Sequence, residues 1–159
     1  MKKPWFPWVS TVARLALGAV MLVAGALKIG DPEAAAQAVR AYKLLPSALE
    51  TPVGWGLPFL EIAIGLLLVV GFGVRAAALA AGVFMVVFIA AVSSAWARGL
   101  AIDCGCFGGG GQVAPGQTQY LQEILRDVGL LALAGWLYLN PSSKFALESD
   151  PYASTGVTA

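Results

Sequence analysis

The sequence contains no histidine among its 159 residues, and it contains only two cysteines. Without histidine, the chain lacks the side chain that most often carries proton transfer near neutral pH. A structural zinc site is also disfavoured, because it takes four ligands and only two thiols are present. We therefore expect no resident metal, and we look for chemistry at the two cysteines.

Charge is the second shortage. Charged residues make up 12% of the chain and hydrophobic residues 58%, with a net charge of +1. A soluble domain of this length would expose more charge. A near-neutral chain also gives no reason to expect a nucleic-acid partner. The composition favours an integral membrane protein whose main partner is the lipid bilayer.

Four apolar segments account for this composition. A membrane-spanning helix needs about 20 apolar residues, and three segments have that length. The fourth reaches it only when the charged residues near its start are included. The sequence thus predicts an all-α, integral membrane four-helix bundle in one domain, 1–141, followed by a polar C-terminal tail, 142–159. The expected spans are 9–28, 53–73, 75–97 and 121–139.

The connections have their own signals. Residues 31–33, Asp-Pro-Glu, are typical of a helix start, and 34–45 is too short to span, so we predict a short interfacial helix between the first two spans. Residues 71–73, Gly-Phe-Gly, predict a tight hairpin. The loop from 98 to about 120 carries both cysteines, and its four consecutive glycines predict no regular structure.

The orientation rests on the N-terminus. Lysines and arginines are divided evenly between the two ends of the predicted bundle, so Lys2 and Lys3, which flank the first span, decide the prediction. The first helix usually dominates, with its positive flank inside. We expect both termini in the cytoplasm and the cysteine loop outside it, in the inner membrane of the cell.

Cys104 and Cys106 are separated by one glycine, Gly105. This spacing can close a small disulfide ring, and tight rings are more easily reduced than structural disulfides. The chain has no further cysteine that could resolve the pair, so exchange would need a partner protein. Two alternatives stay open: inert loop cysteines, and capture of a soft ion such as Cu(I).

Ionisable residues inside a membrane are costly and usually face the bundle interior. Glu61, Arg126, Asp127 and Lys28 all fall near the cysteine end of their spans, whereas Arg14 falls deeper, toward the opposite leaflet. We expect Glu61 and Arg126 to form one buried unit, with a Glu61–Lys28 pair as the alternative. This set could fix the bundle geometry, handle protons or bind a quinone carbonyl.

Several short motifs, in order and spacing, resemble the DoxX-like superfamily and, within it, the MauE family of methylamine-utilisation proteins. The resemblance runs from Arg14 to about Leu139. The motifs are 14–18 with 25–28, 42–46, 58–65, 103–108 and 126–127.

The resemblance implies an inner-membrane redox protein that works with a periplasmic thioredoxin-like protein during maturation of a client enzyme. DoxX-type relatives imply quinone-linked sulfur chemistry. We therefore predict thiol/disulfide exchange through Cys104 and Cys106, an oxidoreductase activity if the protein is an enzyme, and quinone as the candidate acceptor. The alternatives are a non-catalytic assembly factor and a soft-metal or small-molecule handler; a homo-oligomer is compatible with each.

Overall fold

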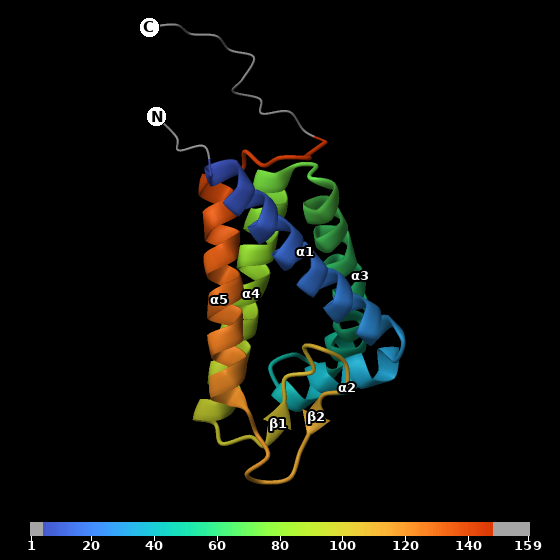
Figure 1. The fold of residues 1–159 in the computed structure, drawn as a ribbon. Coiled ribbons are helices and arrows are strands. Elements are labelled where there is room, and N and C mark those ends of the chain that lie inside the picture. Colours follow the sequence, from blue (N-terminus) through green and yellow to red (C-terminus); the bar gives the residue numbers. More distant parts are fainter. Residues whose placement is uncertain (1–4, 148–159) are drawn as a thin grey trace, which may run out of the picture.

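The structure is a computed structural model that describes residues 5–147 (Figure 1). This part of the chain is mostly helical, as predicted. In order, its elements are α1 (Phe6–Ile29), α2 (Pro32–Tyr42), α3 (Ser47–Val70), α4 (Val74–Ala97), β1 (Ile102–Asp103), β2 (Gly111–Gln112) and α5 (Tyr120–Leu139).

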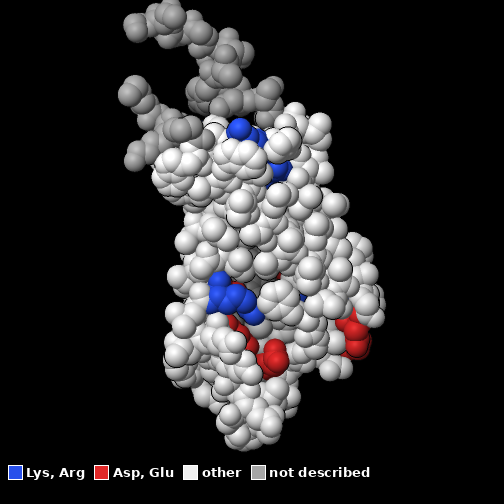
Figure 2. Space-filling view, viewed as in Figure 1, with Lys and Arg blue, Asp and Glu red and all other residues white. Residues whose placement is uncertain are grey.

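Three of the described helices, α1, α3 and α4, are long and apolar enough to cross a membrane. Their outer faces carry well-exposed large apolar residues, such as Val12, Phe59 and Val83, which suit contact with lipid rather than water. Figure 2 shows an uncharged band between basic side chains near the top of the view and a mixed group of basic and acidic side chains in its lower half. The predicted fourth span, α5, is not among the three, because Glu123, Arg126 and Asp127 lie in its first half.

The helices pack as two close pairs. α1 lies against α3, and α4 lies against α5, while α3 and α4 touch at few places (Figure 1). Glycines permit the α1–α3 approach, since a Cβ on Gly25 would stand 2.8 Å from the carbonyl oxygen of Pro58. The core between the pairs includes Leu17, Met21 and Leu68. The weak α3–α4 contact leaves room for a cavity between these two helices.

α3 begins at Ser47, earlier than the predicted start at 53. The prediction followed the apolar run and stopped at Pro52, but the helix continues through Pro52 and Pro58. Both prolines lie past the first turn of α3, so each removes one backbone hydrogen bond from the helix, which nevertheless continues. Pro46 stands at the N-cap, and the first turn, Ser-Ala-Leu-Glu, contains two polar residues, so it lies outside the continuous apolar run.

The short interfacial helix and the hairpin are both found. Asp31 caps α2 by accepting a hydrogen bond from the Ala34 backbone N–H at 3.0 Å. α2 ends at Tyr42, before the predicted Leu45, because Lys43 adopts a left-handed φ of 51°. Gly71 has a φ of 77° at the turn into α4, a conformation that glycine adopts without steric cost.

The cysteine loop is more regular than predicted. β1 and β2 pair antiparallel, with Ile102 opposite Gln112 and Asp103 opposite Gly111. The expectation of no regular structure is therefore wrong at these positions. The intervening glycines take positive φ angles, among them Gly108 and Gly110, and they turn the chain back sharply enough to pair two-residue strands. Such short strands leave no periodic signal in a sequence.

The start of α1 and the end of α5 lie together, at the opposite end from the cysteine loop (Figure 1). Ser10 Oγ donates to the Asn140 carbonyl at 2.9 Å. The first residues of the predicted tail pack back on this end, because the Lys144 N–H donates to Thr11 Oγ1 at 2.8 Å. Lys2, Lys3 and the rest of the tail, 148–159, lie outside the described residues.

Candidate functional site: a disulfide beside a buried charged cluster

Cys104 and Cys106 form a disulfide, with their Cα atoms 5.4 Å apart. Gly105 between them has a φ of 67°, and a Cβ there would stand 2.7 Å from the Cβ of Ala38 on α2. Glycine is therefore required at this position both for its backbone angle and for space. The predicted intramolecular pairing is present, and it is seated against α2.

The two sulfurs have different surroundings. Cys104 is 6% exposed, whereas Cys106 is only partly buried. Cys104 Sγ accepts the Cys106 N–H at 3.1 Å and lies 3.8 Å from Arg126 Nη2. The Arg126 guanidinium also stacks over the Phe107 ring at 5.0 Å. A cation and a backbone donor thus face the Cys104 sulfur, and Cys106 is the more exposed of the two residues.

α5 supplies one acidic partner for Arg126 and another for the Cys104 backbone. Asp127 Oδ1 accepts both Arg126 Nε at 2.9 Å and Nη2 at 2.8 Å. Glu123, one helical turn earlier, accepts the Cys104 N–H at 3.4 Å. One oxygen of each carboxylate is buried without a hydrogen-bond partner among the described residues. Glu123 was missed as a site residue; its i, i+4 spacing from Asp127 was the available signal.

Glu61 does not pair with Arg126, so the prediction of a Glu61–Arg126 ion pair is wrong. Its Oε1 accepts Lys28 Nζ at 2.5 Å, and both side chains are nearly fully buried. The reason is helix packing: α1 lies directly on α3, so the end of α1 brings Lys28 to Glu61. Arg126 projects from α5 toward the cysteine loop instead.

The charged residues nevertheless converge. Glu61, Arg126 and Asp127 border one small cavity together with Cys106 and Phe107. Lys28 adjoins it through Glu61. Four of the five predicted pocket residues therefore gather beneath the disulfide, as two ion pairs rather than one unit.

Arg14 is the exception. It is buried at the other end of the molecule, where Nη1 donates to the carbonyls of Leu68 at 2.7 Å and Val69 at 2.8 Å. Nη2 donates to the carbonyls of Lys144 and Phe145, each at 3.4 Å. Arg14 thus satisfies the C-terminal carbonyls of α3 and holds the returning chain. Its assignment to the pocket is wrong.

Tyr42 is a second residue that sequence reasoning did not place in the site. Its hydroxyl donates to the Cys104 carbonyl at 3.4 Å, and its own carbonyl accepts Arg98 Nη2 at 2.5 Å. Burial, reinforced by the carboxylates of Glu123 and Asp127, raises the pKa of the Tyr42 hydroxyl above its ordinary value. The hydroxyl therefore stays protonated and available as a donor.

A metal could find ligands here only after reduction. Ligand atoms of Asp103, Cys104 and Glu123 lie within 4.8 Å of one another. With Cys104 in a disulfide, its sulfur is not a thiolate, and soft ions bind thiolates. With the disulfide intact, this set of residues therefore lacks the thiolate that a soft ion would bind.

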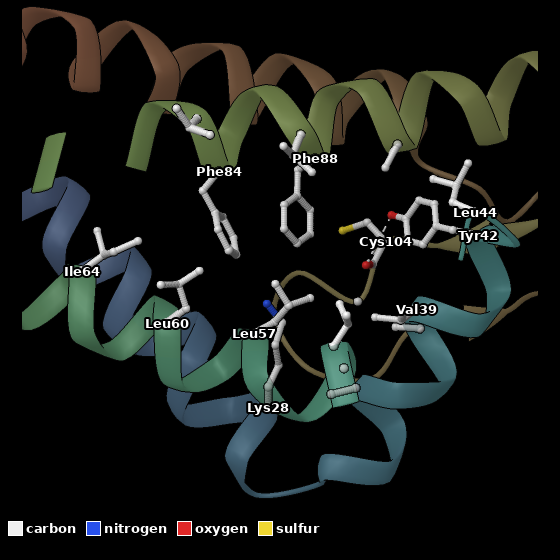
Figure 3. Close-up of a pocket in the computed structure, with 18 of the residues that line it drawn as sticks. Lys28, Val39, Tyr42, Leu44, Leu57, Leu60, Ile64, Phe84, Phe88 and Cys104 are labelled. Atoms are coloured by element: carbon white, nitrogen blue, oxygen red, sulfur yellow. Dashed lines mark hydrogen bonds between the residues drawn. The ribbon is translucent and has the colours of Figure 1, made fainter. Parts of the chain in front are cut away.

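A second, larger cavity of about 730 Å³ borders the disulfide from the other side (Figure 3). It lies between α3 and α4 and is closed at one end by α2. Leu57, Leu60 and Phe88 line it, with Lys28 and Cys104 at its polar end.

Three membrane-length helices with a disulfide loop at one end define a multi-pass membrane protein. The chain belongs to the MauE family: the family profile described as "Methylamine utilisation protein MauE" matches residues 6–140. A curated relative, "Methylamine utilization protein MauE" of Methylorubrum extorquens, is 37% identical over 159 residues, covering 96% of this chain and 82% of the relative.

No solved structure matches the chain. The MauE resemblance inferred from the sequence is confirmed. The wider DoxX-like placement stays a prediction.

Proposed function

We propose that this protein exchanges thiol/disulfide equivalents with an extracytoplasmic thioredoxin-like protein or client enzyme, in the service of methylamine utilisation. The observation that carries the proposal is the inequality of the two sulfurs. The accessible Cys106 is suited to attack by a partner thiolate, and the buried Cys104, 3.8 Å from Arg126, is suited to leave. A nearby cation favours the thiolate form of a cysteine.

The proposed exchange takes two thiol–disulfide steps. A partner thiolate attacks Cys106 Sγ, the S–S bond breaks, and its electron pair stays on Cys104 Sγ as a thiolate beside Arg126. The second partner thiol then attacks the mixed disulfide and releases Cys106. The partner leaves as a disulfide, and its two electrons and two protons remain on the cysteine pair. Glu123, which accepts the Cys104 N–H, has a carboxylate oxygen within 4.8 Å of the Cys104 sulfur and could relay a proton to it.

The proposal includes α5 as a fourth span. Its 20 residues would extend about 30 Å, which matches a bilayer core, and it lies along α4. Its charged residues stand at the cysteine end and pair there. An extracytoplasmic cysteine loop is favoured because disulfides persist in oxidising compartments. Lys2 and Lys3 favour the same orientation.

The rival function is a non-catalytic assembly factor whose loop only docks a client. Phe107 is 40% exposed beside the disulfide, and it could serve docking without any exchange. A Cys104→Ser/Cys106→Ser variant separates the two, because docking would survive the substitution and exchange would not. Metal analysis of the reduced protein tests the soft-metal alternative.

The central test is trapping. In Cys104→Ser, Cys106 remains without its resolving partner, so it should accumulate mixed disulfides that mass spectrometry can identify. Cys106→Ser is the matched control and should trap far less, because Cys104 is buried. Equal trapping by both variants would contradict the proposed roles. A membrane-impermeant maleimide applied to intact spheroplasts reports the side: labelling only after lysis would reverse the orientation.

Arg126→Gln tests the activation of Cys104. In a Cys106→Ser background, we expect alkylation of Cys104 at neutral pH to slow about tenfold and its pH midpoint to rise about one unit. Arg126→Lys should recover part of the rate. Arg40→Gln, which removes a surface cation paired with Glu33, is the control and should change neither quantity.

A further inference from the structure

The cavity between α3 and α4 has the size and lining of a ligand site. Its volume of about 730 Å³ falls within the range of about 300–1,000 Å³ found for small-molecule pockets. In Figure 3, Phe84 and Phe88 point into it from α4, and Leu57, Leu60 and Ile64 approach it from α3. The two rings stack with centroids 4.8 Å apart and form a flat apolar wall.

The cavity opens toward the bilayer. Residues that line it are also exposed on the outer surface, notably Leu60, Leu79, Val83 and Val87. In a membrane this surface meets lipid chains, because it lies on two membrane-length helices. A ligand would enter laterally from the hydrocarbon core, so it must be lipophilic.

The inner end of the cavity is polar, whereas the rest of its wall is apolar. Apart from backbone groups, the polar groups among the described lining residues come from Lys28, Tyr42 and Cys104. Lys28 Nζ lies 5.7 Å from the centre of the Phe88 ring. The Cys104 sulfur points toward the same region in Figure 3. Hydrogen-bond donors and a redox-active sulfur therefore converge at the closed end of an apolar chamber.

We propose that this cavity binds a lipophilic quinone, which oxidises the Cys104–Cys106 dithiol. The proposal rests on the exchange function proposed above. It differs from the sequence-based pocket, because its wall is apolar and only Lys28 is shared. A quinone fits the lining better than a fatty acid does, because the charge of Lys28 is already matched by Glu61.

The reaction balances. The two thiols lose two electrons as the S–S bond of Cys104 and Cys106 forms. The quinone takes up these electrons and both protons on its two oxygens and leaves as a hydroquinone. Lys28 Nζ supplies an N–H donor to a quinone oxygen. One face of the disulfide then serves a partner protein through Cys106, and the other serves the membrane through Cys104.

The test uses purified full-length protein, reduced, freed of reductant and kept without oxygen, with decylubiquinone as the probe. We expect one molecule of quinol for each pair of thiols lost, followed by quinol absorbance and by maleimide mass shift. If decylubiquinone leaves the thiols reduced while a thioredoxin disulfide oxidises them, the quinone site is wrong and the exchange function stands. If neither oxidises them, the exchange function fails.

A matched pair of variants locates the site. Leu60 and Leu66 lie on α3 with similar exposure, 49% and 50%, but only Leu60 lines the cavity. Leu60→Trp should lower the ratio of quinone-driven to glutathione-disulfide-driven oxidation about tenfold, by filling an apolar pocket that quinone needs. Leu66→Trp should leave the ratio unchanged. Equal effects of the two variants would overturn the assignment.

Binding without chemistry gives an independent measurement. In the Cys104→Ser/Cys106→Ser variant, decylubiquinone should raise the unfolding temperature by linkage, and palmitate at the same concentration should not. Equal stabilisation by both would show a nonselective lipid groove. A change of oligomeric state in Leu60→Trp, with quinone oxidation intact, would show instead that a second copy covers the opening. Either result would contradict the proposal.

Discussion

Two buried basic side chains of α1, Arg14 and Lys28, have different kinds of hydrogen-bond partner. At the end of the molecule opposite the cysteine loop, every hydrogen bond that Arg14 makes in the described structure goes to a main-chain carbonyl. Carbonyls neither gain nor lose protons, so this site is a fixed cap on α3. At the other end, Lys28 pairs with Glu61, and the neighbouring groups are other acids and Arg126.

The two ends of the molecule differ in whether the partners of the buried basic groups can take up a proton. Around the disulfide, Glu61, Glu123 and Asp127 each keep one buried oxygen without a partner among the described residues. Such oxygens can receive a proton or a ligand. The Arg14 end offers carbonyls instead of carboxylates. Burial of charge alone therefore does not distinguish the two ends of the molecule; the kind of partner does.

The largest expected effect is at Arg14. Arg14→Gln leaves the carbonyls of Leu68 and Val69 without their cationic donor, and we expect a loss of about 3 kcal/mol or more in the free energy of unfolding in detergent. The rate of Cys104 alkylation in folded protein should not change. Arg75→Gln, an exposed arginine at the same end, is the control and should cost less than about 1 kcal/mol. An Arg14→Gln protein that keeps its stability but shows slower Cys104 alkylation would contradict the purely structural role given to Arg14.

The next effect is at the Lys28–Glu61 pair. Lys28→Gln or Glu61→Gln alone leaves one buried charge unpaired, which costs on the order of 3 kcal/mol. The double variant should recover part of that loss, since no orphan charge remains. Chemical unfolding of the four proteins gives the coupling energy. Strictly additive losses would mean that the two residues do not interact, despite a separation of 2.5 Å.

Much of the fold could be predicted because its signals are local. The three long apolar helices, the Asp31 cap and the glycine turn at Gly71 each follow from short stretches of sequence. The start of α3 at Ser47 could not, because its first turn mixes Ser and Glu with Ala and Leu and so carries no continuous apolar run. The β1–β2 pairing was also hidden, since its strands have two residues each.

The sequence predicted which charged residues lie near the disulfide better than it predicted which of them form ion pairs. Depth along each span correctly brought Lys28, Glu61, Arg126 and Asp127 to the cysteine end. Which of them pair depends on which helices touch, and apolar faces do not encode that in one sequence. Arg14 shows the same limit. Its partners include carbonyls of a chain segment more than 100 residues away, which the sequence analysis had assigned to a polar tail.

The smallest expected effect is at Tyr42, and its sign depends on pH. Because the pKa of the Tyr42 hydroxyl is raised in the fold, folding favours the neutral form. Its contribution is fully present below the ordinary tyrosine value of about 10 and is lost as pH rises toward the folded value. Near neutral pH, Tyr42→Phe should lose about 1 kcal/mol, the worth of the hydrogen bond to the Cys104 carbonyl. Above about pH 10 the wild type should lose stability faster than Tyr42→Phe, by up to about 1.4 kcal/mol per pH unit. Unfolding free energies measured across this range, with Tyr138→Phe as the exposed control, check both parts. If the unfolding free energy of Tyr42→Phe falls as steeply with pH as that of the wild type, the site does not hold this hydroxyl neutral. Tyr42 would then no longer count as a titratable group that distinguishes the cysteine end from the Arg14 end.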